Sequence, residues 1–165
     1  MNEKRVFYYE NELEDEFSKA KIIPRVIDEK YKYKKGFMWD KISYLVQNVF
    51  SEPIKIIYPK LKFKIKYIGR EKVKPYKKQG YFIYANHTQE FVDTFIPSNH
   101  IYPKRNFFIV NPENISMKGS GALVEMLGAI PVPGNIESTK NFLDIIKEHI
   151  EKKHTITIYP EAHIW

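Results

Sequence analysis

The sequence contains no cysteine among its 165 residues, which excludes disulfide bonds, thiolate zinc sites and a cysteine nucleophile. It has no run of about 18 uninterrupted apolar residues, so we expect no membrane-spanning helix. The first residues, "MNEKRVFYYENELEDEF", lack the apolar core of a signal peptide. These absences predict a cytoplasmic protein, either free or peripheral on the inner face of the membrane.

Several motifs of catalysis and ligand binding are also missing. There is no G-x-S-x-G elbow, no P-loop, no G-x-G-x-x-G after a strand and no H-E-x-x-H among the five histidines. Ser120 lies between two glycines, but it precedes a helical pattern rather than following a strand. The sequence therefore gives no support to a covalent serine mechanism or a metal site, and we expect no cofactor.

Charge is unevenly distributed in this chain of net charge +7. Residues 60–78 hold nine Lys or Arg and one acid, which suits an anionic partner such as acidic lipid, a phosphate-rich ligand or nucleic acid. The ordinary alternative is a sheet edge that lysine keeps soluble. Phe63 and Tyr67 fall on the opposite face from the lysines, which argues against base stacking. We therefore expect no nucleic-acid partner.

The apolar content of 43%, with 12 Tyr and 11 Phe, is enough for a packed core in one domain. Residues 42–50 carry an apolar stripe at helical spacing. Such a helix either packs on the core or lies on a membrane surface. We divide the chain into an N-terminal helical and aromatic segment, residues 1–58, which faces the membrane, and an α/β domain, residues 59–165.

Strand and helix patterns alternate after residue 58. Lysines and apolar residues alternate over 60–68, which predicts a strand with one wet face. Short apolar runs predict buried central strands at 81–85 and 106–110. This order indicates an α/β fold with a mostly parallel sheet, flanking helices and sites at the carboxyl ends of strands. The remaining expected elements are strands at 128–132 and 155–159 and helices at 90–99, 117–127 and 138–151, with Ser138 as the N-cap of the last.

The strongest candidate for chemistry is His87, which follows the predicted strand 81–85. Asn86 and Thr88 flank it, and the carboxylates of Glu90 and Asp93 follow three and six residues later. A histidine held by a carboxylate can take a proton from a hydroxyl near pH 7, because its ordinary pKa is about 6.5. Without a nucleophile in the sequence, His87 would activate a hydroxyl of the substrate or a water. Which acid would partner it stays open.

Three segments in order resemble the glycerolipid acyltransferase family, whose members are similar to lysophosphatidic acid acyltransferase. "ANHTQEFVD" (85–93) resembles its first motif, Asn-His followed by four residues and Asp. "LGAIPVPGN" (127–135) and "IYPEAHIW" (158–165) resemble its second and third blocks. The resemblance covers about residues 60–165. It implies a glycerol-3-phosphate-acyltransferase-like α/β fold, and we expect this chain to be incomplete at the C-terminus.

The resemblance also implies an activity in phospholipid biosynthesis. Members transfer a fatty acyl group from acyl-CoA or acyl-carrier protein to a hydroxyl, commonly that of a lysophospholipid, at a membrane surface. By this resemblance, His87 is the general base, Asp93 orients it, and Glu161 helps to bind the acceptor. The other residues that it implies in substrate binding are Asn86, Thr88, Pro160 and Gly128.

The sequence departs from the family pattern at three points. Five residues rather than four separate His87 from Asp93, so Glu90 stays an alternative partner of the histidine. Gly134 stands near the position of an expected arginine, and residues 162–164 replace Gly-Thr-Arg. The acceptor could then be a different alcohol, or lysines could supply the charge. A second hypothesis is an inactive or truncated relative that binds lipid or membrane without catalysis.

Overall fold

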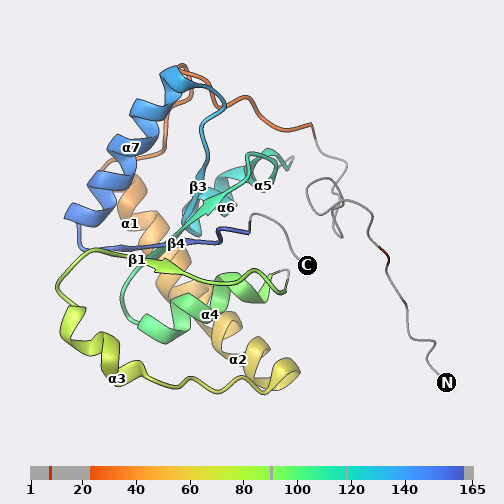
Figure 1. Cartoon of the computed structure of the whole chain (residues 1–165), viewed down its shortest axis with the longest axis vertical. Helices are drawn as coiled ribbons and strands as arrows, with labels where there is room; N and C mark the ends of the chain where they lie inside the picture. The colour runs from red at the N-terminus through yellow and green to blue at the C-terminus, as the bar shows by residue number, and fades with distance from the viewer. Residues whose placement is uncertain (1–7, 9–22, 90, 118, 162–165) are drawn as a thin grey trace.

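A computed structural model describes residues 8, 23–89, 91–117 and 119–161 (Figure 1). Four parallel strands form one sheet in the order β1-β4-β2-β3. This confirms the α/β fold with a parallel sheet and flanking helices. The strands are β1 (Tyr81–Tyr84), β2 (Asn106–Val110), β3 (Ala129–Pro131) and β4 (Thr155–Ile158).

Helices precede and connect the strands (Figure 1). In the described part of the chain, none combines the length and the apolar character needed to cross a membrane. The helices are α1 (Phe37–Leu45), the π-helical turn η1 (Val46–Phe50), α2 (Glu52–Phe63), α3 (Arg70–Val73), the 3₁₀ turn η2 (Lys74–Tyr76), α4 (Val92–Ile101), α5 (Glu113–Ser116), α6 (Gly121–Met126) and α7 (Ile136–Glu151).

The core lies between the sheet and α7. Phe107 of β2 and Ile156 of β4 are buried against Ile130 and Ile145, because β2 and β4 are the two inner strands of the sheet. Helix α7 begins at Ile136, so the predicted N-cap at Ser138 is wrong. Asn135 is the N-cap, and its side chain and that of Ser138 each accept a backbone N–H in a capping box.

Strand β1 lies at the edge of the sheet, which corrects the prediction of a buried central strand at 81–85. It pairs with β4 alone among the described strands, and Phe82 and Tyr84 are 43% and 69% exposed. A continuous apolar run indicates a strand but not its place in the sheet. Here the last strand in sequence, β4, inserts between β1 and β2 and leaves β1 outside.

The predicted strand at 60–68 is also wrong. Helix α2 ends at Phe63, its C-cap Lys64 has a left-handed φ of 52°, and residues 65–69 form an irregular segment. Lys and Leu are good helix formers, and Ile54, Ile57 and Leu61 continue a helical spacing that the local alternation conceals. The expected sheet edge lined by lysine is therefore wrong, because these lysines lie at the end of α2 and in the segment after it.

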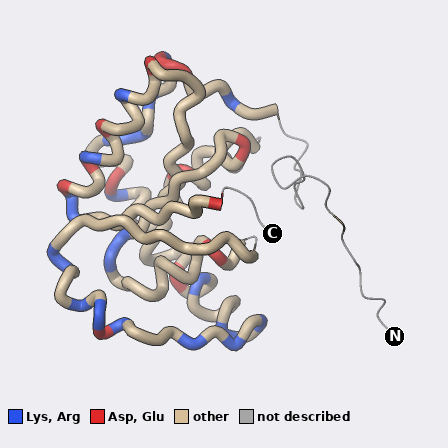
Figure 2. Tube along the Cα trace, in the orientation of Figure 1, with Lys and Arg blue, Asp and Glu red and all other residues tan. Residues whose placement is uncertain are grey.

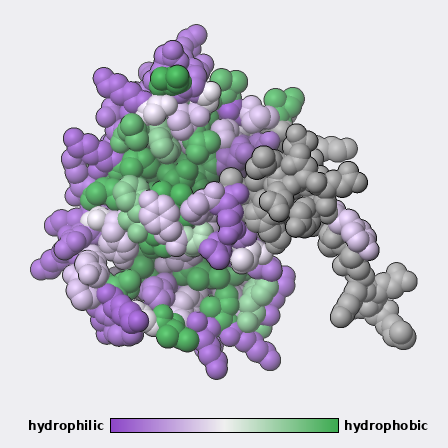
Figure 3. All heavy atoms as spheres, in the orientation of Figure 1, coloured by the Kyte–Doolittle hydropathy of each residue, from purple (hydrophilic) through white to green (hydrophobic). Residues whose placement is uncertain are grey.

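The helices α1, η1 and α2 bury polar residues and expose apolar ones. Ser43 donates to the carbonyl of Met126 at 2.7 Å, and Asn48 donates to that of Pro103 at 3.0 Å. Of the two alternatives for the stripe at 42–50, packing on the core is therefore the wrong one. Hydrophobic residues are visible in the lower part of Figure 3, where α2 and α4 lie. We call the exposed set the outer apolar face: Ile42, Leu45, Val49, Phe50, Ile54, Ile57 and Leu61, each at least 43% exposed.

Candidate active site

Polar side chains gather where β1 and β4 end, at the carboxyl edge of the sheet. Ala85 donates its N–H to the carbonyl of Ile158 at 3.1 Å, so the two chains leave the sheet side by side. His87 follows on one chain and Glu161 on the other. Ligands of parallel α/β sheets bind at this edge, and the order of elements in Figure 1 places the first turn of α4 beside it.

His87 and Asp93 form the centre of this cluster. The Nδ1 atom of His87 lies 2.9 Å from Oδ2 of Asp93, whose side chain is 4% exposed. The backbone N–H groups of Thr88 and Gln89 donate to the same oxygen at 2.6 and 2.8 Å. A carboxylate can only accept, so Nδ1 of His87 carries the hydrogen and Nε2 keeps its lone pair. The arrangement can therefore accept a proton at Nε2.

The extra residue between His87 and Asp93 is accommodated just before α4. Phe91 has a φ of 64°, a conformation that is uncommon for a residue other than glycine. The turn brings Asp93, in the first turn of α4, back to His87. Glu90, the alternative partner, lies outside the described residues, so its role stays a prediction.

Tyr159 completes the cluster, and sequence reasoning missed it. Its ring stacks on that of His87, with centroids 4.8 Å apart and 28° between the planes. Its hydroxyl donates to the carbonyl of Asp93. Burial raises the pKa of Tyr159 well above its usual value, so the hydroxyl keeps its proton. The available signal was an aromatic residue directly after a buried strand, at the start of the third block.

The other predicted residues beyond β1 and β4 lie around this centre. Glu161 accepts a hydrogen bond from the N–H of His87 at 3.2 Å, and Pro160 is the residue between it and Tyr159. Asn86 and Thr88 flank His87 and are exposed. These side chains are available to a ligand that approaches His87 from solvent. Residues 162–164 lie outside the described part of the chain.

Gly128 is not part of this cluster. It immediately precedes β3 and therefore lies at the amino edge of the sheet, whereas His87 lies at the carboxyl edge. Its φ is 106°, and a Cβ atom there would lie 2.7 Å from the carbonyl oxygen of Asn106. The need for glycine at this position comes from close backbone packing, so we leave Gly128 out of the proposed site.

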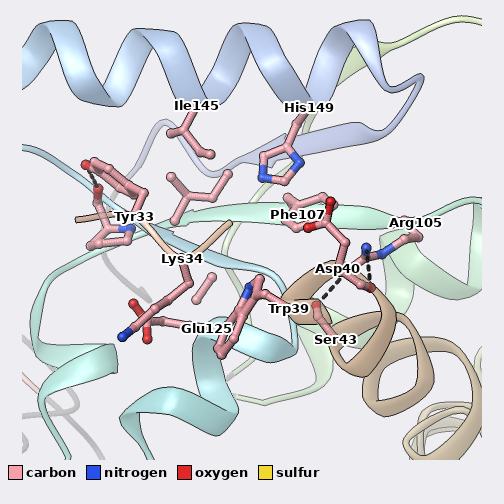
Figure 4. Close-up of a pocket in the computed structure, with 13 residues that line it drawn as sticks. Tyr33, Lys34, Trp39, Asp40, Ser43, Arg105, Phe107, Glu125, Ile145 and His149 are labelled. Atoms are coloured by element: carbon pink, nitrogen blue, oxygen red, sulfur yellow. Dashed lines mark hydrogen bonds between the residues drawn. The ribbon is translucent and has the colours of Figure 1, made fainter. Parts of the chain in front are cut away.

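A small cavity lies between α1, α7 and β3, away from His87 (Figure 4). Its volume is about 20 Å³, which is enough for one water. Arg105 points into this region, but its guanidinium already donates to Ser43 and to Gln47. We therefore assign no ligand to this cavity.

Basic side chains occupy the segment from the end of α2 through η2, which is drawn blue in the lower part of Figure 2. Lys60, Lys62, Lys64 and Lys66 are exposed. They lie beside the outer apolar face, because Leu61 and Lys62 share the last turn of α2. Apolar and cationic groups therefore meet at this end of the helix.

A protein-family model described as "Acyltransferase" matches residues 64–165. The matched region contains all four strands, the His87–Asp93 pair and Glu161. Comparisons with curated proteins and with solved structures found no match. The family match spans more than half of the chain and all of its sheet. The chain therefore belongs to the acyltransferase family, in the glycerolipid group that resembles lysophosphatidic acid acyltransferase.

Proposed function

We propose that this protein transfers a fatty acyl group from a thioester, acyl-CoA or acyl-carrier protein, to a hydroxyl of a lysophospholipid or related lipid alcohol. The observation that carries the proposal is the hydrogen bond between His87 Nδ1 and Asp93 Oδ2, which leaves Nε2 as a base. The family match supports acyl transfer in glycerolipid biosynthesis.

In the proposed reaction, Nε2 of His87 removes the proton from the acceptor hydroxyl while its oxygen attacks the thioester carbonyl. Asp93 stabilises the imidazolium that forms. The tetrahedral intermediate collapses by breaking the carbon–sulfur bond. The thiolate then takes the proton from His87, which returns the base to its first state. Each step uses one acid or base of the chain, and no acyl-enzyme is needed.

Acceptor binding is assigned to the polar groups around His87. Glu161, Asn86 and Thr88 offer hydrogen bonds to the acceptor, and Pro160 shapes the turn that presents Glu161. Gly134, which stands where the family has an arginine, donates its N–H to the carbonyl of Ile27 at 2.8 Å. The lysines at the end of α2 are the proposed source of charge for an anionic acceptor or donor.

We further propose that the protein works at the inner face of the membrane through the outer apolar face. Apolar insertion flanked by lysine is the chemistry that binds anionic bilayers. The division into a membrane-facing segment, residues 1–58, and an α/β domain, residues 59–165, is part of this proposal. Co-sedimentation with anionic vesicles tests it: Phe50→Glu/Leu61→Glu should lose binding, whereas Tyr84→Ser, which removes an exposed ring elsewhere, should keep it. Equal binding by all three proteins would exclude this surface.

The chemical proposal is tested with labelled acyl-CoA and a panel of lysophospholipids. We expect product from wild type and none from His87→Gln. His100→Gln is the matched control, since His100 lies on α4 beside Tyr67. Loss of activity in Asp93→Asn with Glu90→Gln unaffected would assign the partner role to Asp93. Product formation by His87→Gln at the wild-type rate would refute the base.

A second candidate function is lipid binding without turnover. The absence of arginine at Gly134 favours it. It predicts that vesicles or lysophospholipids bind equally to wild type and to His87→Gln, with no product from either protein under any donor and acceptor. Any His87-dependent product excludes it.

A further inference from the structure

Four aromatic rings form a continuous row between the start of α4 and the end of α2. Phe91 and Phe95 have ring centroids 5.5 Å apart. Phe95 and Tyr58 follow at 6.5 Å, and Tyr58 and Phe63 at 6.1 Å. The interplanar angles of 84°, 86° and 70° are those of edge-to-face contacts. We call these four residues the aromatic strip.

The aromatic strip runs from the start of α4, the helix that carries Asp93, to the outer apolar face. At one end, Phe91 directly precedes α4, whose first turn holds Asp93. At the other end, Tyr58 lies three residues before Leu61 on α2, so their side chains are neighbours on the helix surface, and Leu61 is 74% exposed. The ammonium of Lys62 lies 5.2 Å above the ring of Tyr58 and donates to its hydroxyl. A row of aromatic rings therefore runs from the residue before α4 to a surface that carries cationic groups.

Helix packing accounts for only part of this strip. Tyr58 and Phe95 are half-buried where α2 packs against α4. Phe91, by contrast, is 72% exposed, and its φ of 64° costs energy in a residue other than glycine. Contiguous exposed apolar surface next to a reactive group is typical of a ligand-binding groove.

We propose that the aromatic strip binds the hydrocarbon chain of the acceptor lipid while the acceptor's hydroxyl sits at Nε2 of His87. The inference rests on the proposed acyl transfer. A lipid acceptor resident in the membrane must bring its hydroxyl to His87 without drawing its chain through water. The aromatic strip supplies the apolar path, and Lys62 stands where that path meets anionic headgroups.

The strip predicts how binding depends on chain length. Full burial of one methylene strengthens binding about fourfold, so a chain half-buried on an open strip gains about twofold per methylene. A chain that stayed in solvent would gain nothing. Phe91→Ser removes the exposed end of the strip without disturbing α2, and Phe95→Ala interrupts its centre.

The test is equilibrium binding by calorimetry with unreactive acceptor analogues. They are ether-linked lysophospholipids that carry hydrogen in place of the reacting hydroxyl, with chains of eight to fourteen carbons, used below their critical micelle concentration. For wild type we expect about twofold tighter binding per methylene, and for Phe91→Ser and Phe95→Ala a markedly weaker dependence. Leu143→Ser, at an exposed position of α7, is the matched control and should keep the wild-type slope.

Two outcomes would overturn the inference. The first is that Phe91→Ser keeps the wild-type change in affinity per methylene. Because the Phe91 side chain is exposed, we expect this variant to fold normally. The second is a wild-type affinity that is the same for every chain length from eight to fourteen carbons. Because the analogues do not react, failure of the acyl-transfer proposal would leave this measurement intact, and His87→Gln should retain the chain-length dependence.

Discussion

Two histidines at the amino edge of the sheet should make the protein sensitive to acid. Nδ1 of His149 lies 3.2 Å from Nδ1 of His154, and both rings pack against Phe107. His149 is buried, at 7% exposed, and His154 is half-buried. When both rings are neutral, one Nδ1 atom can donate a hydrogen bond to the other. Protonation of the accepting ring would place two N–H donors against each other.

The surroundings of this pair favour its neutral form. Burial, followed by the positive charges of Arg105 and Lys152, lowers the pKa of His149 to about 4. Burial and the same cations, with His149, lower the pKa of His154 to about 3. Asp40 acts in the opposite direction on both, but Lys152 binds its carboxylate at 2.7 Å. The folded state therefore excludes protons that the unfolded chain accepts.

The sign and size of the effect follow from linkage. An unfolded histidine has a pKa of about 6.5, so the contribution to stability is complete above that pH and is lost as the pH falls toward the folded pKa of His149, about 4. Between pH 7.5 and 5.5, the low pKa of each histidine should reduce the free energy of unfolding by about 1.3 kcal/mol. Because His154 is partly exposed, we expect about 2 kcal/mol for the pair, a large share of the ~5–15 kcal/mol of a typical domain.

Urea unfolding followed by circular dichroism at pH 7.5, 6.5 and 5.5 measures this loss. Wild type should lose about 2 kcal/mol more over this range than the double variant His149→Phe/His154→Phe, and His154→Asn alone should fall between them. His100→Gln, outside the cluster, should retain the wild-type pH dependence. If the double variant and wild type have the same pH dependence, the pair is not the acid-sensitive element and the reasoning is refuted.

Three further predictions concern the site and its support. Tyr159→Phe keeps the stack on His87 but loses a hydrogen bond worth about 1 kcal/mol, so kcat should fall about fivefold with KM unchanged, whereas Tyr159→Leu should also shift the pH profile. Gly128→Ala should lower the free energy of unfolding in urea by roughly 2 kcal/mol or more, since its Cβ would meet Asn106. Lys55→Met should lower the free energy of unfolding by about 3–5 kcal/mol, measured by thermal unfolding, because it leaves the buried carboxylate of Glu52 without its ion-pair partner. Adding Glu52→Gln should restore much of this stability.

The parts of the fold that could be predicted from the sequence are those in which local pattern and tertiary role agree. The runs at 106–110 and 155–159 became the inner strands β2 and β4. Phe107 and Ile156 are buried on one face, and Asn106, Thr155 and Thr157 are buried on the other and hydrogen-bond to one another. The helix near 138–151 was predicted because its apolar stripe packs on that core. His87 and Asp93 were found because polar residues after a buried run lie at the carboxyl edge of a parallel sheet.

The errors arose where tertiary partners override local pattern. Alternating lysine and apolar residues fit a strand, but they also fit the last turn of a helix followed by an extended segment, and the packing of α2 on α4 selects the helix. The helical segment α1–η1–α2 is inverted, in the sense that it buries polar side chains and exposes apolar ones. This arrangement could not be predicted, because the buried polar side chains donate hydrogen bonds to backbone carbonyls that are distant in the sequence. Gln47 donates to the carbonyl of Leu127, eighty residues away in sequence, at 3.2 Å.

That inversion links the fold to the proposed chemistry. A polar helix face buried against carbonyl groups costs little, because each donor finds an acceptor. The apolar face, however, remains in water, and exposed apolar area costs about 25 cal/mol per Å² relative to burial. A bilayer removes this cost and leaves the buried network undisturbed. The aromatic strip runs from this face to the start of α4, so acceptor delivery would begin where the membrane binds. Because Phe91 lies outside the outer apolar face, substitutions there should alter acceptor use without altering vesicle binding, whereas those at Phe50 should alter both.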